Sequence, residues 1–186
     1  LGLALTLLTI ANISTMAFGG ALARRFSHRF ILLTSLPLLW ITLLLILTGT
    51  SEAMLFVFLF AHGLVIGVTD VIMNAEGSAI EHDLKRPVFT AFHGCVSASV
   101  AVFAITSSLL TAKFGTLSAA CAALSVVALA SYAVWKNVPV RALPANLGAG
   151  KTAARVASVP LTLMGIAAGL VIASETSAMF WSAKML

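Results

Sequence analysis

Six long apolar stretches constrain the fold of this chain more than any motif does. A helix needs about 20 apolar residues to cross the hydrocarbon layer of a bilayer, which is roughly 30 Å thick. The stretches that meet this length are residues 1–22, 30–50, 54–74, 88–111, 114–135 and 159–186. The sequence therefore predicts an all-α fold, a polytopic bundle of transmembrane helices with six visible spans.

The composition supports this prediction and excludes most classes of soluble protein. Of the 186 residues, 60% are apolar and 9% are charged, whereas a soluble domain is about 45–50% apolar and about 25% charged. A cytosolic enzyme, a nucleic-acid-binding protein and a disordered chain would all need a more polar surface. Cys95 and Cys121 lie inside apolar stretches, where free cysteine behaves as a small apolar residue, so we expect neither a disulfide nor a metal site.

A polar interruption at residues 136–158 divides the chain. It contains two prolines, two glycines and four basic residues, a composition typical of an exposed linker. We expect an N-terminal-half transmembrane bundle at residues 1–135 and a cytoplasmic linker at residues 136–158. Residues 159–186 would then be the first helix of a second half.

The basic residues are unevenly divided between the two sides of the membrane. When the joints between stretches are assigned to alternate sides, nine of the 11 Lys and Arg residues fall on one side, and Lys113 and Lys184 fall on the other. This bias places the basic joints in the cytoplasm. Residue 1 then lies on the outer side, so we expect an odd number of upstream spans, most simply one. The chain would be an internal piece of a longer, transporter-like protein.

One face of the third stretch combines small and polar residues. At roughly 100° per residue, a helix places Gly63, Gly67, Asp70, Asn74 and Gly77 within about 80° of one another. Small residues let a neighbouring helix approach closely, and lipid cannot satisfy a carboxyl or an amide. This face is therefore predicted to lie toward the bundle interior or a water-filled cavity.

Two interpretations of Asp70 and Asn74 stay open from the residues alone. The two side chains could clamp neighbouring helices through hydrogen bonds worth about 1 kcal/mol. Alternatively, Asp70 exchanges protons, because withdrawal from water favours the neutral form of a carboxyl, and Asn74 helps to bind a polar substrate. A carboxylate at mid-membrane costs about 2.5–3.5 kcal/mol on insertion scales and is expected to be functional, which favours the second interpretation.

Four further polar residues and one tryptophan lie in or near the spans. His93, close to the start of the fourth stretch, could relay protons, bind a substrate hydroxyl or form a packing hydrogen bond. Glu175 lines a pathway or pairs with a helix outside this chain, and Trp181 follows it on another face. His62 is interpreted as a packing histidine, and Glu76 as a residue of the cytoplasmic mouth that reaches water.

A family resemblance begins at the joint after the first stretch. The joint reads Gly20-Ala-Leu-Ala-Arg-Arg-Phe-Ser-His-Arg29. It resembles the loop signature of the major facilitator superfamily, Gly-x-Leu-Ala-Asp-Arg-x-Gly-Arg-Arg/Lys, although Arg24 replaces the aspartate and Ser27 a glycine. The resemblance implies a cytoplasmic gate of basic and acidic side chains. The residues expected to form the gate are Arg24, Arg25, Arg29, Glu76 and Glu81, with Asp83 as an alternative acid.

A stronger resemblance joins the chain to the fucose-permease-like branch of that superfamily, including its bacterial inner-membrane members. The motifs that carry it are Asp70-Val-Ile-Met-Asn74, Arg86-Pro87, Phe92-His93-Gly94 and Glu175-Thr-Ser-Ala-Met-Phe-Trp181. The last motif departs from the pattern of the branch at Thr176 and Phe180, where glycine and aspartate are usual. The six stretches then correspond to helices two to seven of a twelve-helix protein.

The resemblance implies a secondary active transporter with a partial major-facilitator fold. Asp70 matches the acid of the fourth helix that is implicated in proton-coupled sugar uptake. The residues expected to bind substrate are Asn74, His93, Glu175 and Trp181. We expect a small polar solute such as a sugar, protons and the lipid bilayer as partners, with no nucleic acid, cofactor or metal. The full-length protein is expected to be a monomer with several spans in the inner (plasma) membrane.

Three alternative functions stay open. A membrane-embedded enzyme would need clustered metal ligands or a nucleophile beside a base, and the sequence contains no HExxH, paired-aspartate or Gly-x-Ser-x-Gly motif. We therefore expect no catalytic residues. A sensor or assembly subunit with a transporter fold is favoured by Arg24 at the aspartate position. An uncoupled facilitator would differ from a symporter only in its independence of a proton gradient.

Overall fold

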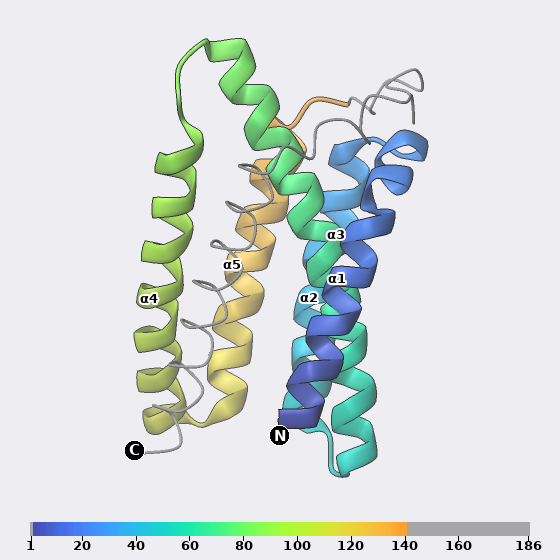
Figure 1. Cartoon of the computed structure of the whole chain (residues 1–186). Helices are drawn as coiled ribbons and strands as arrows, with labels where there is room; N and C mark the ends of the chain where they lie inside the picture. The colour runs from blue at the N-terminus through green and yellow to red at the C-terminus, as the bar shows by residue number, and fades with distance from the viewer. Residues whose placement is uncertain (1, 141–186) are drawn as a thin grey trace. The chain divides into compact units, whose positions relative to one another are not determined.

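Residues 2–140 are described by the computed structural model, and this part of the chain forms five α-helices and no strand (Figure 1). The helices are α1 Gly2–Arg25, α2 His28–Thr48, α3 Glu52–Leu84, α4 Phe89–Phe114 and α5 Thr116–Asn137. All five are long and apolar enough to cross a membrane, which is the architecture of a multi-pass membrane protein. The predicted all-α class is thus confirmed for this part. The sixth predicted span and most of the predicted linker lie outside the described residues.

Short joints with suitable capping residues separate the helices. The hydroxyls of Ser27 and Ser51 accept hydrogen bonds from the backbone N–H groups of Phe30 and Met54, at 3.3 and 3.2 Å. Each serine thereby satisfies an N–H group that has no partner within its helix. Gly115 joins α4 to α5 with φ of 84°, a conformation that favours glycine because it has no Cβ.

Helix α3 extends beyond the predicted membrane span. The predicted membrane span covers residues 54–74, whereas α3 has 33 residues and continues to Leu84. The backbone hydrogen bonds continue past the hydrophobic stretch because residues 75–84 contain no proline, and Gly77, the one glycine among them, lies against the ring of Phe89. Lys85, with φ of 50°, ends the helix in the left-handed conformation.

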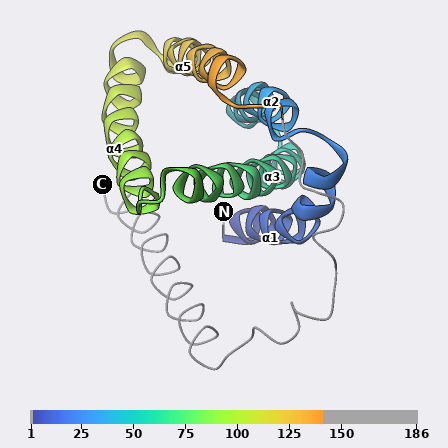
Figure 2. The same ribbon diagram turned by 90° about the horizontal axis from the view of Figure 1, so that it is seen from above.

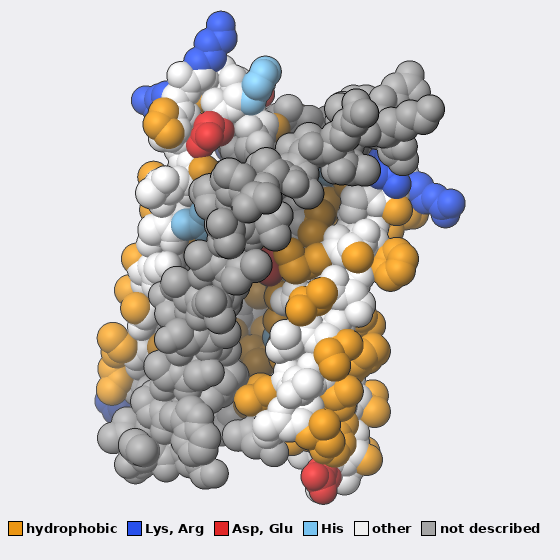
Figure 3. All heavy atoms as spheres, viewed as in Figure 1, with side chains coloured by type: hydrophobic (Ala, Val, Ile, Leu, Met, Phe, Trp, Pro, Cys, Tyr) orange, Lys and Arg blue, Asp and Glu red, His pale blue; other side chains and the backbone are white. Residues whose placement is uncertain are grey.

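Helix α3 is the centre of the described bundle. It packs against α1 and α2, while α2 also packs against α5, and α5 against α4 (Figure 2). A small core of Ala23, Ile31, Leu32 and Ile72 lies where α1, α2 and α3 meet. Many large apolar side chains remain exposed along the helices (Figure 3), as expected for surfaces that face lipid.

The closest helix contact is between α1 and α3, and two glycines allow it. A Cβ atom at Gly63 would collide with the backbone oxygen of Leu8, and one at Gly67 with the backbone oxygen of Asn12. Both glycines belong to the face of α3 that was predicted to accept a neighbouring helix. That part of the prediction is confirmed.

Substitution of Gly67 by alanine is expected to destabilise the bundle. The added Cβ would meet the backbone of Asn12, which cannot rotate away as a side chain can. We expect Gly67→Ala to lower the free energy of unfolding of the purified full-length protein by about 1–3 kcal/mol, the usual cost of overpacking. Gly94→Ala is the matched control, since nothing lies within 4 Å of its added Cβ. Equal stability of the two variants would contradict this description of the α1–α3 contact.

Candidate functional site

Asp70 lies near the middle of α3, on the face that also carries the glycines. Its side chain is partly buried, as is that of Asn74 one helical turn further along. At one end of this face Gly67 contacts α1, and at the other end a Cβ on Gly77 would lie 3.1 Å from the ring of Phe89 in α4. The face therefore turns toward neighbouring helices, and Asp70 and Asn74 lie between these two contacts.

The structure brings Asp70 together with His93 of α4. The two side chains are close enough for an electrostatic interaction across the gap between the helices. The exposed His93 ring packs edge-on against two aromatic rings of its own helix, with centroids 4.7 Å from Phe89 and 5.4 Å from Phe92. Because Phe89 also contacts Gly77 of α3, the same aromatic group that orients His93 also anchors the start of α4 against α3.

This arrangement can carry out proton exchange. Carboxyl and imidazole groups are the side chains that most often donate and accept protons in proteins. The amide of Asn74, next to them on α3, can donate and accept hydrogen bonds. The three side chains together could hold a proton and a hydroxyl-bearing solute in a largely apolar bundle.

Glu76 differs from the expectation that it is a water-accessible mouth residue. It is 6% exposed, and its Oε1 lies 2.6 Å from Nδ1 of His28, which is 3% exposed. The expectation was wrong because Glu76 lies on the side of α3 that packs against the start of α2, where His28 contacts it. His28 was not among the predicted residues, and because the two partners are 48 positions apart no local spacing could have indicated the pair.

Glu81 caps a helix rather than pairing with the arginines of the predicted gate. Its Oε2 accepts hydrogen bonds from the backbone N–H groups of Val88 and Phe89, at 3.0 and 2.9 Å. A carboxylate at this position satisfies N–H groups that have no partner within α4 and is favoured by the helix dipole. Within residues 2–140, the salt bridges are His28–Glu76 and His82–Asp83, and neither includes Glu81 or an arginine.

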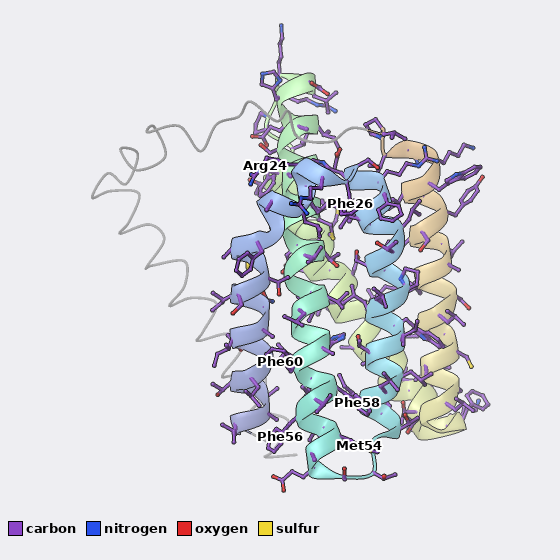
Figure 4. All side chains as sticks on the ribbon, turned by 90° about the vertical axis from the view of Figure 1, so that its right-hand side faces the viewer. Arg24, Phe26, Met54, Phe56, Phe58 and Phe60 are labelled. Carbon is purple, nitrogen blue, oxygen red and sulfur yellow. The ribbon has the colours of Figure 1, made fainter. Side chains whose placement is uncertain are left out.

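The three arginines of the predicted gate lie at the joint between α1 and α2. Figure 4 shows Arg24 and Phe26 at this joint, at the opposite end of the helices from Met54. Arg24 and Arg25 are exposed, whereas Arg29 is partly buried, with its guanidinium 5.7 Å from the ring centroid of Trp135 in α5. Within residues 2–140 neither salt bridge includes one of these arginines, and the gate stays a prediction.

Two polar side chains within the bundle have structural partners. Nδ1 of His62 lies 2.7 Å from the hydroxyl of Thr42, which links α3 to α2. This is the packing role that was predicted for His62. The indole Nε1 of Trp40 donates a hydrogen bond of 2.9 Å to the backbone oxygen of Ala120, which links α2 to α5.

A cavity of about 910 Å³ lies between α4 and α5, with Leu43 of α2 also in its wall. Its lining is mostly apolar, including Phe92, Phe103 and Val127, and it includes none of Asp70, Asn74 and His93. The cavity is thus separate from the polar residues of α3.

Some predicted residues cannot be placed in this arrangement. Glu175 and Trp181, expected to contribute to substrate binding, lie outside the described residues. Within residues 2–140 no group of three or more His, Cys, Asp or Glu side chains could hold a metal ion.

The described fold is that of a helical, multi-pass membrane protein, and its most distinctive polar group is Asp70 with His93 and Asn74. Comparisons with family models, curated proteins and solved structures found no match to the chain.

Proposed function

We propose that the chain belongs to a secondary active transporter that moves a small polar solute, such as a sugar, by proton-coupled alternating access. The observation that carries the proposal is the position of Asp70, a carboxyl half-way along a membrane-spanning helix that interacts with His93 of the neighbouring helix. Ionisable groups at this depth are rare and usually belong to ion or substrate pathways. The resemblance of the surrounding motifs to the fucose-permease-like branch of the major facilitator superfamily supports the same function.

In the proposed mechanism Asp70 alternates between a carboxylate and a carboxylic acid. Uptake of a proton removes its charge, so the helices around it can rearrange without moving an unpaired charge through the apolar bundle. His93 receives or supplies this proton, and Asn74 forms hydrogen bonds with the solute. In secondary transporters the two halves rock about a site within the membrane, and Asp70 lies inside the third membrane-spanning stretch.

We also propose a role for two residues outside the described part of the chain and a location for the protein. Glu175 and Trp181 would contribute to the solute site from the second half, and the full-length protein would work as a monomer in the inner membrane. Its cytoplasmic side would be the one that carries Arg24, Arg25 and Arg29, as the distribution of basic residues indicates.

A second candidate is a transporter-fold protein that no longer transports, such as a sensor or an assembly subunit. The observation that favours it is the joint between α1 and α2, where Arg24 stands at the position of an aspartate. Such a protein would keep the bundle and would move no solute.

Uptake of radiolabelled monosaccharides into vesicles that contain the full-length protein distinguishes these functions. We expect at least one sugar to accumulate when a proton gradient is applied, and a protonophore to abolish the accumulation. Uptake that survives the protonophore would indicate a facilitator. Failure to move any member of a broad panel of sugars and other small polar solutes would support the non-transporting alternative.

A further inference from the structure

Two cationic and two aromatic side chains form a continuous row where α2 begins and α5 ends. The guanidinium of Arg29 lies 5.7 Å from the ring centroid of Trp135, and the rings of Trp135 and Tyr132 are 6.0 Å apart. The ammonium of Lys136 lies 6.0 Å from the ring centroid of Tyr132. We call Arg29, Trp135, Tyr132 and Lys136 the cation–aromatic row.

The positive charges of the row are not neutralised by the described part of the protein. Both salt bridges within residues 2–140 are formed by histidines, and neither includes Arg29 or Lys136. The two aromatic rings between the cations are open to the surroundings, since Trp135 and Tyr132 are each 56% exposed. Among the described residues, the row therefore presents two cations without a salt-bridge partner, one at each end of an accessible aromatic surface.

The position of the row matches the headgroup level of a bilayer. It lies at the ends of two membrane-spanning helices, on the side that the distribution of basic residues assigns to the cytoplasm. Tryptophan and tyrosine are enriched at this level. Toward the membrane interior the next turn of α5 is apolar, because Leu129, three residues before Tyr132, is 69% exposed.

We propose that the cation–aromatic row binds the headgroup of an anionic phospholipid in the cytoplasmic leaflet. The phosphate would lie over the exposed rings, attracted by Arg29 at one end of the row and by Lys136 at the other, and an acyl chain would lie against the exposed apolar surface that includes Leu129. Arginine and lysine form strong charge-assisted hydrogen bonds with phosphate oxygens, and basic groups between helices on this side bind acidic headgroups. The adjoining apolar surface favours a lipid over free phosphate. This site is independent of the proposed transport mechanism.

Trp135 provides a direct test, because bromine on a lipid chain quenches the fluorescence of a nearby tryptophan. The full-length protein is placed in phosphatidylcholine vesicles that contain increasing amounts of brominated phosphatidylglycerol or brominated phosphatidylcholine. The signal of Trp135 is the difference between the protein and its Trp135→Phe variant. We expect stronger quenching by brominated phosphatidylglycerol than by brominated phosphatidylcholine at the same fraction of lipid.

Substitution of the two cations tests the assignment of the residues. Arg29→Gln and Lys136→Gln are each expected to weaken the preference for phosphatidylglycerol about fivefold, the effect of one basic residue at an anionic surface. Lys113→Gln is the matched control. The Lys113 ammonium lies 5.2 Å from the ring centroid of Phe114 in a similar cation–aromatic pair, at the C-terminal end of α4. The distribution of basic residues assigns Lys113 to the opposite side of the membrane from the row. Lys113→Gln should leave the preference unchanged.

Equal quenching of Trp135 by the two brominated lipids would overturn the proposal. It would also be overturned if Lys136→Gln kept the full preference, or if Lys113→Gln weakened the preference as much as Lys136→Gln does. Quenching by brominated phosphatidylcholine reports that each variant is folded and inserted. Loss of sugar uptake with an intact lipid preference would count against the proposed transport function and leave the lipid site standing.

Discussion

Replacement of Asp70 by asparagine is expected to abolish accumulation of the transported solute against its gradient. Asparagine keeps the size of the side chain but cannot bind and release a proton, so the coupling step is lost. Symport of one proton driven by a membrane potential of about 100 mV supplies roughly 2.3 kcal/mol, or about fiftyfold accumulation. The Asp70→Asn variant should reach a ratio of inner to outer solute close to one, measured by uptake of the labelled sugar into vesicles.

Glu52→Gln is the matched control for this substitution. Glu52 lies in the exposed first turn of the same helix, so loss of its charge should leave accumulation unchanged. Downhill exchange of labelled sugar by Asp70→Asn would show that the variant is folded and still binds solute. Undiminished accumulation by Asp70→Asn would remove Asp70 from the coupling mechanism.

Replacement of His28 by leucine is expected to have the largest effect on stability. The substitution leaves the buried carboxyl of Glu76 without the imidazole that lies 2.6 Å from it, and removal of one partner from a buried pair costs about 3–5 kcal/mol. The Nε2 atom of His28 is already buried without a hydrogen-bond partner, so a leucine at this position loses no second hydrogen bond. The free energy of unfolding of the purified full-length protein measures the effect.

Two further variants show whether the loss of stability in His28→Leu comes from the buried pair or from the loss of any histidine. His82→Leu removes a histidine from the exposed His82–Asp83 pair, where the atoms are 3.7 Å apart, and such surface pairs contribute about 0–1 kcal/mol. The double variant His28→Leu/Glu76→Leu should recover most of the stability, because two apolar side chains can replace a buried pair. A His28→Leu variant as stable as His82→Leu would contradict the importance of the buried pair.

The transmembrane architecture could be predicted because each span depends on the average hydrophobicity of about 20 consecutive residues. Each of the first five apolar stretches corresponds to one of the five helices, and the close contacts at Gly63 and Gly67 follow from their shared helix face. The end of α3 could not be placed in the same way. Hydrophobicity indicates where a helix leaves the lipid, whereas the helix itself ends only where its backbone hydrogen bonds end, at Leu84.

The contacts of the polar residues were much harder to predict. Charge alone suggested that Glu76 and Glu81 pair with the nearby arginines. In the structure Glu76 contacts His28, and Glu81 accepts hydrogen bonds from the backbone at the start of α4. These partners depend on the rotation and tilt of whole helices, which no short motif specifies. The proximity of Asp70 and His93 likewise follows from the contact between Gly77 and Phe89.

The central claim, that the carboxyl of Asp70 faces a path for water and solute, is tested most directly by the reactivity of a cysteine at its position. Asp70→Cys and Leu64→Cys are made in the full-length protein, with every other cysteine replaced by serine, and treated with a membrane-impermeant thiol reagent. Leu64 lies on an exposed apolar surface of the same helix and should not react. We predict that the cysteine at position 70 is modified; a cysteine there that reacts only with a lipid-soluble reagent, or with none, would contradict the account.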